Sequence, residues 1–122
     1  MSTLQTSAVA DVATLRTALE KSDAPTIISL FSDDAELRVL DHLHPPSKPQ
    51  IFRGKEAIAG YWNDLCGREM THTVERIVRD GDTLAYSEAC RYPDGARVQC
   101  IAVLDLVNGK VARLVGVQTW DE

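Results

Sequence analysis

The stretch that decides the fold is THTVERIVRDGDTLAYSEACRYPDGARVQCIAVLDLVNGKVARLVGVQTW, residues 71–120. Three turn signals interrupt its apolar-rich segments: Asp80-Gly81, Pro93-Asp94-Gly95 and Asn108-Gly109. Asp-Gly and Asn-Gly favour tight hairpins because these residues tolerate positive φ. We therefore predict four consecutive antiparallel strands, over residues 70–79, 82–92, 97–107 and 110–120.

Helices are predicted ahead of this meander. Apolar residues at helical spacing predict a first helix over residues 9–20. Asp23, as an N-cap followed by Pro25 in the first turn, predicts a short second helix. Gly54 precedes a predicted third helix over residues 55–66, whose apolar residues share one stripe.

One strand is predicted between the second and third helices. Residues 35–41 alternate in polarity, with Leu37, Val39 and Asp41 on one face. The loop that follows contains three prolines within residues 44–49, which argues against a helix or a central strand there. This order of elements, with helices before the four-stranded meander, predicts a single α+β domain over residues 1–122, with a flexible N-terminus at residues 1–7.

Length and composition narrow the classes of function. The 122 residues carry a net charge of −5 and the arginines are dispersed among acids, which argues against nucleic-acid binding. No apolar run is long enough to span a bilayer and no secretory signal is visible, so we expect no membrane partner. The three cysteines, Cys66, Cys90 and Cys100, lack metal-site spacing and fit a cytoplasmic location. No motif implies a metal or another cofactor.

The register of the hairpins predicts which side chains share a face of the sheet. If Asn108-Gly109 is a two-residue turn, Gln99 lies opposite Gln118, and the preceding turn places Glu88 opposite Ile101. One face then mixes aromatic and polar side chains: Tyr86, Glu88, Cys90, Tyr92, Gln99, Ile101, Val103, Leu114, Gly116, Gln118 and Trp120. The other face is almost purely aliphatic: Cys100, Ala102, Leu104, Leu106, Val111, Val115 and Val117. We expect the helices to cover the first face as a pocket and a second subunit to cover the other, giving a homodimer.

Two registers compete for the first strand of the meander. A three-residue turn with a glycine bulge at Gly81 turns His72 and Val74 inward, whereas a two-residue turn buries two threonines and Glu75. Burying the valine costs less than burying the glutamate, so we predict the bulge. His72 then lies directly opposite Glu88.

Five short motifs follow one another along the chain: LFSDDA at 30–35, RGKEAI at 53–58, DGD at 80–82, NGKV at 108–111 and WD at 120–121. Their order and spacing resemble the nuclear transport factor 2-like superfamily, and within it the SnoaL-like and ketosteroid-isomerase-like proteins. The resemblance covers nearly the whole chain. It implies a cystatin-like architecture, a cone-shaped, strongly bent mixed sheet with three N-terminal helices that enclose a pocket, and frequent dimers through the sheet.

The resemblance does not supply a catalytic set. Ketosteroid isomerases use a Tyr and two Asp, and alignment through the motifs places Leu15, Val39 and Ile101 at those positions. Limonene-epoxide-hydrolase-like members use an Arg and two Asp, and the corresponding positions here hold Glu88, Cys90 and Gly116. Neither reaction is therefore supported, since a fold alone does not define a function.

The sharpest catalytic hypothesis is His72 with Glu88. A carboxylate beside an imidazole orients the ring, and the pair can act as general acid and base inside an apolar cone. The alternative is a structural hydrogen-bonded pair at the rim. Asp41 is a third catalytic candidate at the pocket mouth, against the alternative that it only starts the loop containing His42 and His44.

The predicted ligand-binding residues are aromatic, amide and thiol side chains: Trp62, Tyr86, Cys90, Tyr92, Gln99, Gln118 and Trp120. Two interpretations stay open. In the first, the protein is a cofactor-independent isomerase, cyclase or hydrolase that acts on a small apolar or amphipathic carbonyl compound. In the second, it is a non-catalytic ligand-binding or dimerisation module.

Overall fold

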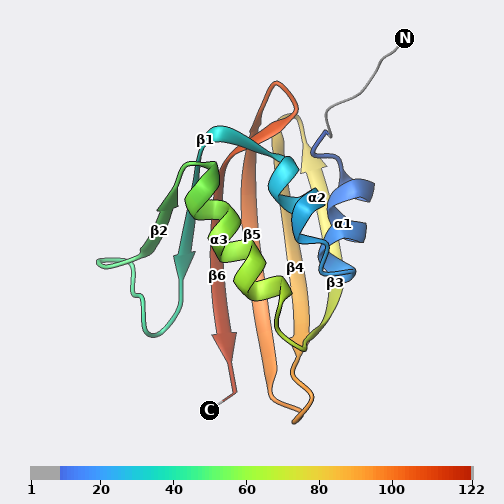
Figure 1. Ribbon diagram of the computed structural model, residues 1–122, viewed down its shortest axis with the longest axis vertical. Coiled ribbons are helices and arrows are strands. Elements are labelled where there is room, and N and C mark those ends of the chain that lie inside the picture. Colours follow the sequence, from blue (N-terminus) through green and yellow to red (C-terminus); the bar gives the residue numbers. More distant parts are fainter. Residues whose placement is uncertain (1–8, 122) are drawn as a thin grey trace.

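The computed structural model describes residues 9–121 and contains one six-stranded sheet with three helices (Figure 1). The elements are α1 (Val12–Glu20), α2 (Ala24–Ser29), β1 (Phe31–Leu40), β2 (Gln50–Arg53), α3 (Lys55–Cys66), β3 (Thr71–Asp80), β4 (Thr83–Arg91), β5 (Arg97–Val107) and β6 (Lys110–Trp120). The predicted α+β class and bent sheet are confirmed. The flexible N-terminus expected at residues 1–7 lies outside the described residues. Among the described helices, none is long and apolar enough to cross a membrane.

The strands are arranged in the order β2-β1-β6-β5-β4-β3. β1 runs parallel to β6 and the remaining neighbours are antiparallel, so the sheet is mixed, as expected. The strands of the meander begin and end within one residue of the predicted positions. β2 is not predicted by the sequence pattern, because four residues after a proline-rich loop are too few to show an alternation.

Local side-chain chemistry sets where the helices begin. The Asp11 carboxylate accepts a hydrogen bond from Thr14 N at 2.7 Å, so α1 begins three residues later than predicted. Asp23 caps α2 through Thr26 N at 3.2 Å, as predicted. α3 has the predicted bounds and follows Gly54, whose φ of 85° suits a residue without a Cβ.

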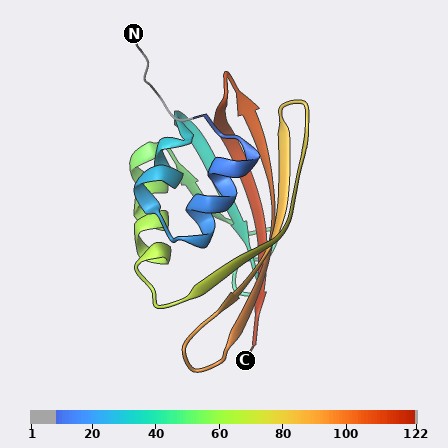
Figure 2. The same ribbon diagram turned by 90° about the vertical axis from the view of Figure 1, so that its right-hand side faces the viewer.

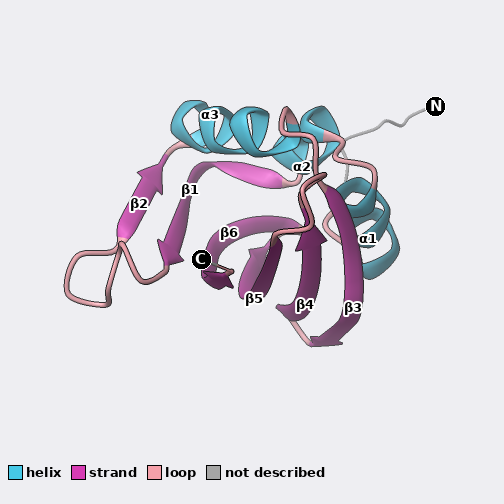
Figure 3. Cartoon of the chain, turned by 90° about the horizontal axis from the view of Figure 1, so that it is seen from below, coloured by secondary structure: helices cyan, strands magenta, loops and turns pink. Residues whose placement is uncertain are grey.

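All three helices lie on one face of the sheet, and no helix formed by residues 9–121 lies on the other face (Figure 2). Seen from below, the sheet curves beneath the helices from β2 at one edge to β3 at the other (Figure 3). The core fills the space between the two layers. Its largest fully buried side chains are Phe31, Ile27, Leu30, Leu37, Ile58, Leu84, Leu104 and Val111.

The side chains of β5 point to the opposite faces from those predicted. Arg91 pairs with Arg97, so the loop between β4 and β5 is one residue longer than expected. A bulge beside Asp105 also shifts the register between β5 and β6 by one residue. Because a one-residue slip exchanges the faces of a strand, four predicted outward residues point into the core and three predicted inward residues point outward. The first group is Cys100, Ala102, Leu104 and Leu106, and the second is Gln99, Ile101 and Val103.

The physical reason for this register is the burial of leucine. Leu104 and Leu106 are 0% and 4% exposed under the helices, whereas Ile101 keeps 57% of its surface exposed on the open face. The inward residues predicted on β4 and β6, from Tyr86 to Cys90 and from Leu114 to Trp120, keep their predicted face. The open face of the sheet is still aliphatic, but its apolar side chains on β5 are Ile101 and Val103 instead of the predicted Leu104 and Leu106.

β3 has the predicted inward residues and a different register. Its turn is tight, with Asp80 paired to Thr83, so the glycine bulge predicted at Gly81 is wrong. The bulge instead lies inside the strand, after Val74. His72 consequently faces inward but pairs with Cys90 rather than with Glu88.

The bulge in β3 is held by α1. Arg16 Nη1 donates a hydrogen bond to Val74 O at 3.0 Å, and Glu20 Oε2 accepts one from Val74 N at 2.9 Å. Residues four apart on a helix share a face, so Arg16 and Glu20 reach the same backbone unit. They provide hydrogen-bond partners for the backbone C=O and N–H of Val74 at the bulge, and they anchor the strand that carries His72.

Candidate functional site

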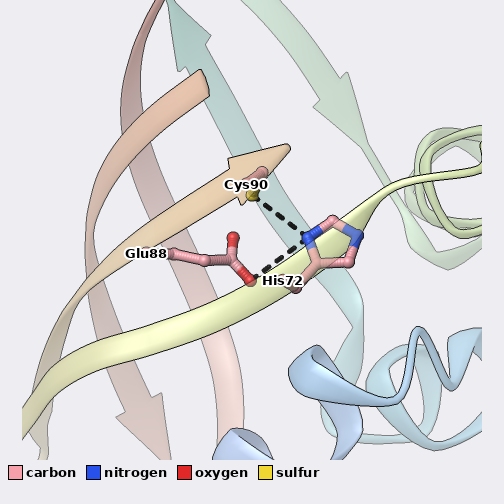
Figure 4. A group of neighbouring side chains, drawn as sticks. All are labelled: His72, Glu88 and Cys90. Carbon is pink, nitrogen blue, oxygen red and sulfur yellow. Dashed lines mark hydrogen bonds and ion pairs between the residues drawn. The ribbon is translucent and has the colours of Figure 1, made fainter. Parts of the chain in front are cut away.

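His72, Glu88 and Cys90 form a cluster on the inner face of β3 and β4 (Figure 4). Cys90 lies directly opposite His72, and Glu88 lies two residues earlier on β4, so the three side chains share one face. His72 Nδ1 is 3.1 Å from Cys90 Sγ and 3.5 Å from Glu88 Oε2. The structure thus brings together the two residues expected as a pair and adds Cys90 to them.

The cluster is shielded from solvent. The side chains of His72 and Glu88 are 5% and 7% exposed. Among residues 9–121, no group forms a hydrogen bond with Glu88 Oε2 or with Trp62 Nε1 in the helix above it. A buried polar atom without a hydrogen bond costs about 1–3 kcal/mol. These two atoms therefore mark places where a polar group of a bound molecule would be stabilised.

The thiols near Glu88 are weak nucleophiles. Burial and the charge of Glu88 together raise the pKa of Cys90 well above its usual range and that of Cys100 to about 12. The same two causes raise the pKa of Cys66. Because the thiolate is the nucleophile, covalent catalysis by Cys90 is not favoured at neutral pH.

A small void lies beneath α3. It has a volume of about 30 Å³. Its lining combines polar groups with an apolar wall: Leu37, Val39, Tyr61, Trp62, Leu65, Tyr86, Glu88, Cys100, Ala102, Leu114, Gly116 and Gln118. Glu88 is therefore the carboxylate that a small molecule in this void would meet.

A wider hollow, which we call the mouth, lies further along the same strands. It measures about 210 Å³ and is lined by Arg68, Tyr92, Ala96, Arg97, Val98, Trp120 and Asp121. Trp120 follows Gln118 by two residues on β6, and Val98 precedes Cys100 by two on β5. Two residues of a strand span about 7 Å, so the mouth and the void are separated by one step of the sheet.

All the predicted ligand-binding residues except Gln99 belong to this region. Trp62, Tyr86 and Gln118 line the void, Tyr92 and Trp120 line the mouth, and Cys90 belongs to the cluster. Gln99 faces outward, where its Nε2 donates to Glu75 Oε1 at 2.8 Å. The prediction of two facing glutamines is wrong because the β5 register places Cys100 opposite Gln118.

Two polar residues of the site are missing from the predicted ligand-binding set. Tyr61 on α3 accepts a hydrogen bond from Gln118 Nε2 at 3.2 Å, and burial raises the pKa of Tyr61, which keeps its hydroxyl protonated. Arg68 Nη1 donates to Tyr92 Oη at 3.0 Å at the mouth. The only signal for Tyr61 is its place beside Trp62 on the apolar stripe of α3, where packing and pocket lining look alike.

Asp41 stabilises the loop after β1 through hydrogen bonds within that loop. Its Oδ1 accepts hydrogen bonds from Leu43 N and from His44 Nδ1, both at 2.9 Å. It lines neither the void nor the mouth. The structure does not bring Asp41 to His72 and Glu88, and this arrangement favours the alternative in which Asp41 shapes a loop.

Comparison with known proteins agrees with the architecture. The family model of the SnoaL-like domain matches residues 12–114. The chain therefore belongs to the SnoaL-like family, within the NTF2-like proteins. No curated protein matches the sequence.

Solved structures share the fold at low sequence identity. A protein from Kribbella flavida, provisionally named a ketosteroid isomerase, is 20% identical, with a TM-score of 0.70 over 90% of this chain and 74% of that chain. IdmH from Streptomyces antibioticus, provisionally named a polyketide cyclase, is 23% identical, with a TM-score of 0.64 over 88% of each chain. An NTF2-like protein of unknown function from Mesorhizobium loti is 13% identical, with a TM-score of 0.75 over 86% of this chain and 84% of that chain.

Proposed function

We propose that this protein binds a small, mainly apolar carbonyl compound beneath α3 and acts on it by acid–base chemistry without a cofactor. The observation that carries the proposal is Glu88, a buried carboxylate whose Oε2 has no hydrogen bond and which lines the void. His72, 3.5 Å from that oxygen, is placed to exchange a proton with it. The neighbours named as a ketosteroid isomerase and a polyketide cyclase support this class of substrate.

Three side chains that line the void, and His72 beside Glu88, have roles in the proposed reaction. Glu88 removes a proton from the carbon next to the carbonyl group, and His72 orients the carboxylate and relays the proton. Negative charge then develops on the carbonyl oxygen. Tyr61 Oη and Trp62 Nε1, which both belong to residues lining the void, are donors able to stabilise that charge.

The space available limits the size of the ligand. Pockets for drug-sized molecules usually measure about 300–1,000 Å³, whereas the void is about 30 Å³ and the mouth about 210 Å³. A compound with one ring fits the mouth. Its carbonyl end must reach one step along β6, from Trp120 to Gln118, to approach Glu88.

The test is hydrogen–deuterium exchange at carbon, because it detects proton removal without knowledge of the full reaction. Cyclohexanone and 2-cyclohexenone are incubated in D₂O with protein that a chelator has freed of metal ions, and exchange is followed by NMR. Wild type should accelerate exchange next to the carbonyl, and Glu88→Gln, which keeps the shape, should reduce that rate by at least about 100-fold. Glu75→Gln is the matched control, since Glu75 is exposed on the outer face and bonded to Gln99.

Two results would contradict this proposal. If neither ketone binds, or if exchange is equally fast in Glu88→Gln, acid–base catalysis at this site is wrong. If the ketones bind to wild type and no exchange occurs, the protein is a non-catalytic ligand-binding module. The small volume of the void, about 30 Å³, is the observation that favours this second function.

We further propose that the protein is a homodimer through the open face of the sheet and that it resides in the cytoplasm, where free thiols such as Cys66 are stable. Ile101, Val103 and Val117 are 57%, 44% and 52% exposed on that face. Asp105 lies opposite Arg113 at its margin, so two copies related by a twofold axis can pair opposite charges.

Analytical ultracentrifugation tests the dimer. Wild type should sediment as a dimer at micromolar concentration, and Ile101→Lys should sediment as a monomer because it places a charge in the centre of the apolar surface. Leu43→Lys is the control, since Leu43 is 65% exposed in the loop after β1. A monomeric wild type would refute the proposed dimer.

A further inference from the structure

The cluster of His72, Glu88 and Cys90 has the composition and spacing of a metal site. One ligand atom from each residue, an imidazole nitrogen, a carboxylate oxygen and a thiol sulfur, lies within 4.8 Å of the other two. His72 Nδ1 is 3.1 Å from the sulfur and 3.5 Å from the oxygen. Zinc bonds of about 2.0–2.3 Å in tetrahedral geometry separate ligand atoms by about 3.3–3.6 Å. The two separations from His72 Nδ1 therefore lie within a few tenths of an ångström of those in a zinc site.

Two features distinguish this cluster from an ordinary buried hydrogen-bonded group. Glu88 Oε2 is buried and has no hydrogen-bond partner in the described part of the chain, so it retains an unused electron pair beside His72. A void of about 10 Å³, lined in part by Cys66, His72 and Glu88, lies against the cluster. A space of that size holds about one water molecule, which is what the fourth position of a zinc ion with three protein ligands requires.

We propose that His72 Nδ1, a Glu88 carboxylate oxygen and Cys90 Sγ bind one Zn²⁺ ion, with a water molecule as the fourth ligand. The donor set of nitrogen, oxygen and sulfur is one that zinc accepts and that calcium and magnesium, which prefer oxygen, do not. Cys90 gives up its thiol proton to solvent on binding. This inference does not rest on the proposed reaction: zinc occupies the groups that would move a proton, so acid–base catalysis belongs to the metal-free protein.

The test uses Co²⁺ as a spectroscopic substitute for Zn²⁺. Protein purified with reduced thiols and freed of metal by a chelator is titrated with Co²⁺ and followed by absorption. Wild type should bind one equivalent and develop a thiolate-to-cobalt charge-transfer band together with the visible bands of a tetrahedral site, and Zn²⁺ should displace them. Cys90→Ser should lose the charge-transfer band. Glu88→Gln should weaken binding by at least about tenfold, the smallest loss expected even for residues that only support a ligand.

Cys100→Ser is the matched control, because Cys100 is a thiol on the neighbouring strand, opposite Glu88 and outside the cluster. It should keep the band. The near-isosteric exchanges to serine and glutamine keep the core filled, and circular dichroism of each variant checks its fold. The absence of a charge-transfer band in wild type, or a band that survives Cys90→Ser, would overturn the assignment.

Discussion

Gly116 provides a direct test of whether the void beneath α3 is where a ligand binds. It lies on β6 between Val39 and Ala102 in the cross-strand row, and these neighbours are buried on the inner face. A Cβ added to Gly116 would meet Leu114 Cδ2 at 3.5 Å, an ordinary contact, and the backbone is not in the left-handed region. Alanine therefore fits, and its methyl group enters the void of about 30 Å³ that Gly116 lines.

The expected effect of Gly116→Ala is a more stable protein that binds ligand less well. Reducing the freedom of the unfolded chain contributes about 0.4–1 kcal/mol, and burying one methyl-sized group contributes about 0.8 kcal/mol. The free energy of unfolding should thus rise by about 1–2 kcal/mol, measured by urea denaturation with tryptophan fluorescence. The Kd of cyclohexanone, measured by NMR titration, should rise by about tenfold or more, since the loss of about 1.4 kcal/mol corresponds to that factor.

Gly60→Ala is the control for Gly116→Ala. Gly60 lies in the middle of α3 and is exposed, and apart from its own turn of the helix no described atom lies within 4 Å of an added Cβ. Alanine there should stabilise the helix by about 1 kcal/mol and leave ketone binding unchanged. If Gly116→Ala destabilises the protein, the void is closed in solution. If it stabilises the protein and binding is unaffected, the ligand does not reach the void.

Two further predictions concern the support of the site and its thiols. Glu20→Ala should lower the free energy of unfolding by about 1–3 kcal/mol in urea denaturation, because Val74 N loses its acceptor at the bulge; an effect as small as that of the neighbouring exposed Lys21→Ala would contradict the anchoring role. Burial and Glu88 raise the pKa of Cys100 from 9.0 to about 12, so the folded protein keeps this proton while the unfolded chain loses it. Stability should therefore fall as the pH rises from 9 toward 12, and Cys100→Ala should make the slope shallower by up to about 1.4 kcal/mol per pH unit. Equal slopes in the two proteins would show that the thiol ionises in the folded state as it does in the unfolded chain.

The sequence by itself determined the elements and their order. Turn chemistry at Asp80-Gly81 and Asn108-Gly109, the N-cap at Asp23 and the stripe of α3 are local signals, because each depends on residues within a few positions of one another. They place most helices and strands within a few residues of their observed bounds. β2 escapes because its only evident reason to be extended is its pairing with β1.

Only the tertiary structure decided which faces the side chains of β5 occupy and which groups meet in the site. A one-residue change in the loop after Arg91 and a bulge beside Asp105 moved Gln99 outward and Cys100 inward. No local pattern encodes such a slip, since a strand with apolar residues on both faces permits either register, and the burial of leucine beneath distant helices selects one. The bulge after Val74 has the same origin: Arg16 and Glu20 hold it from α1, and it decides that His72 meets Cys90 and Glu88 together.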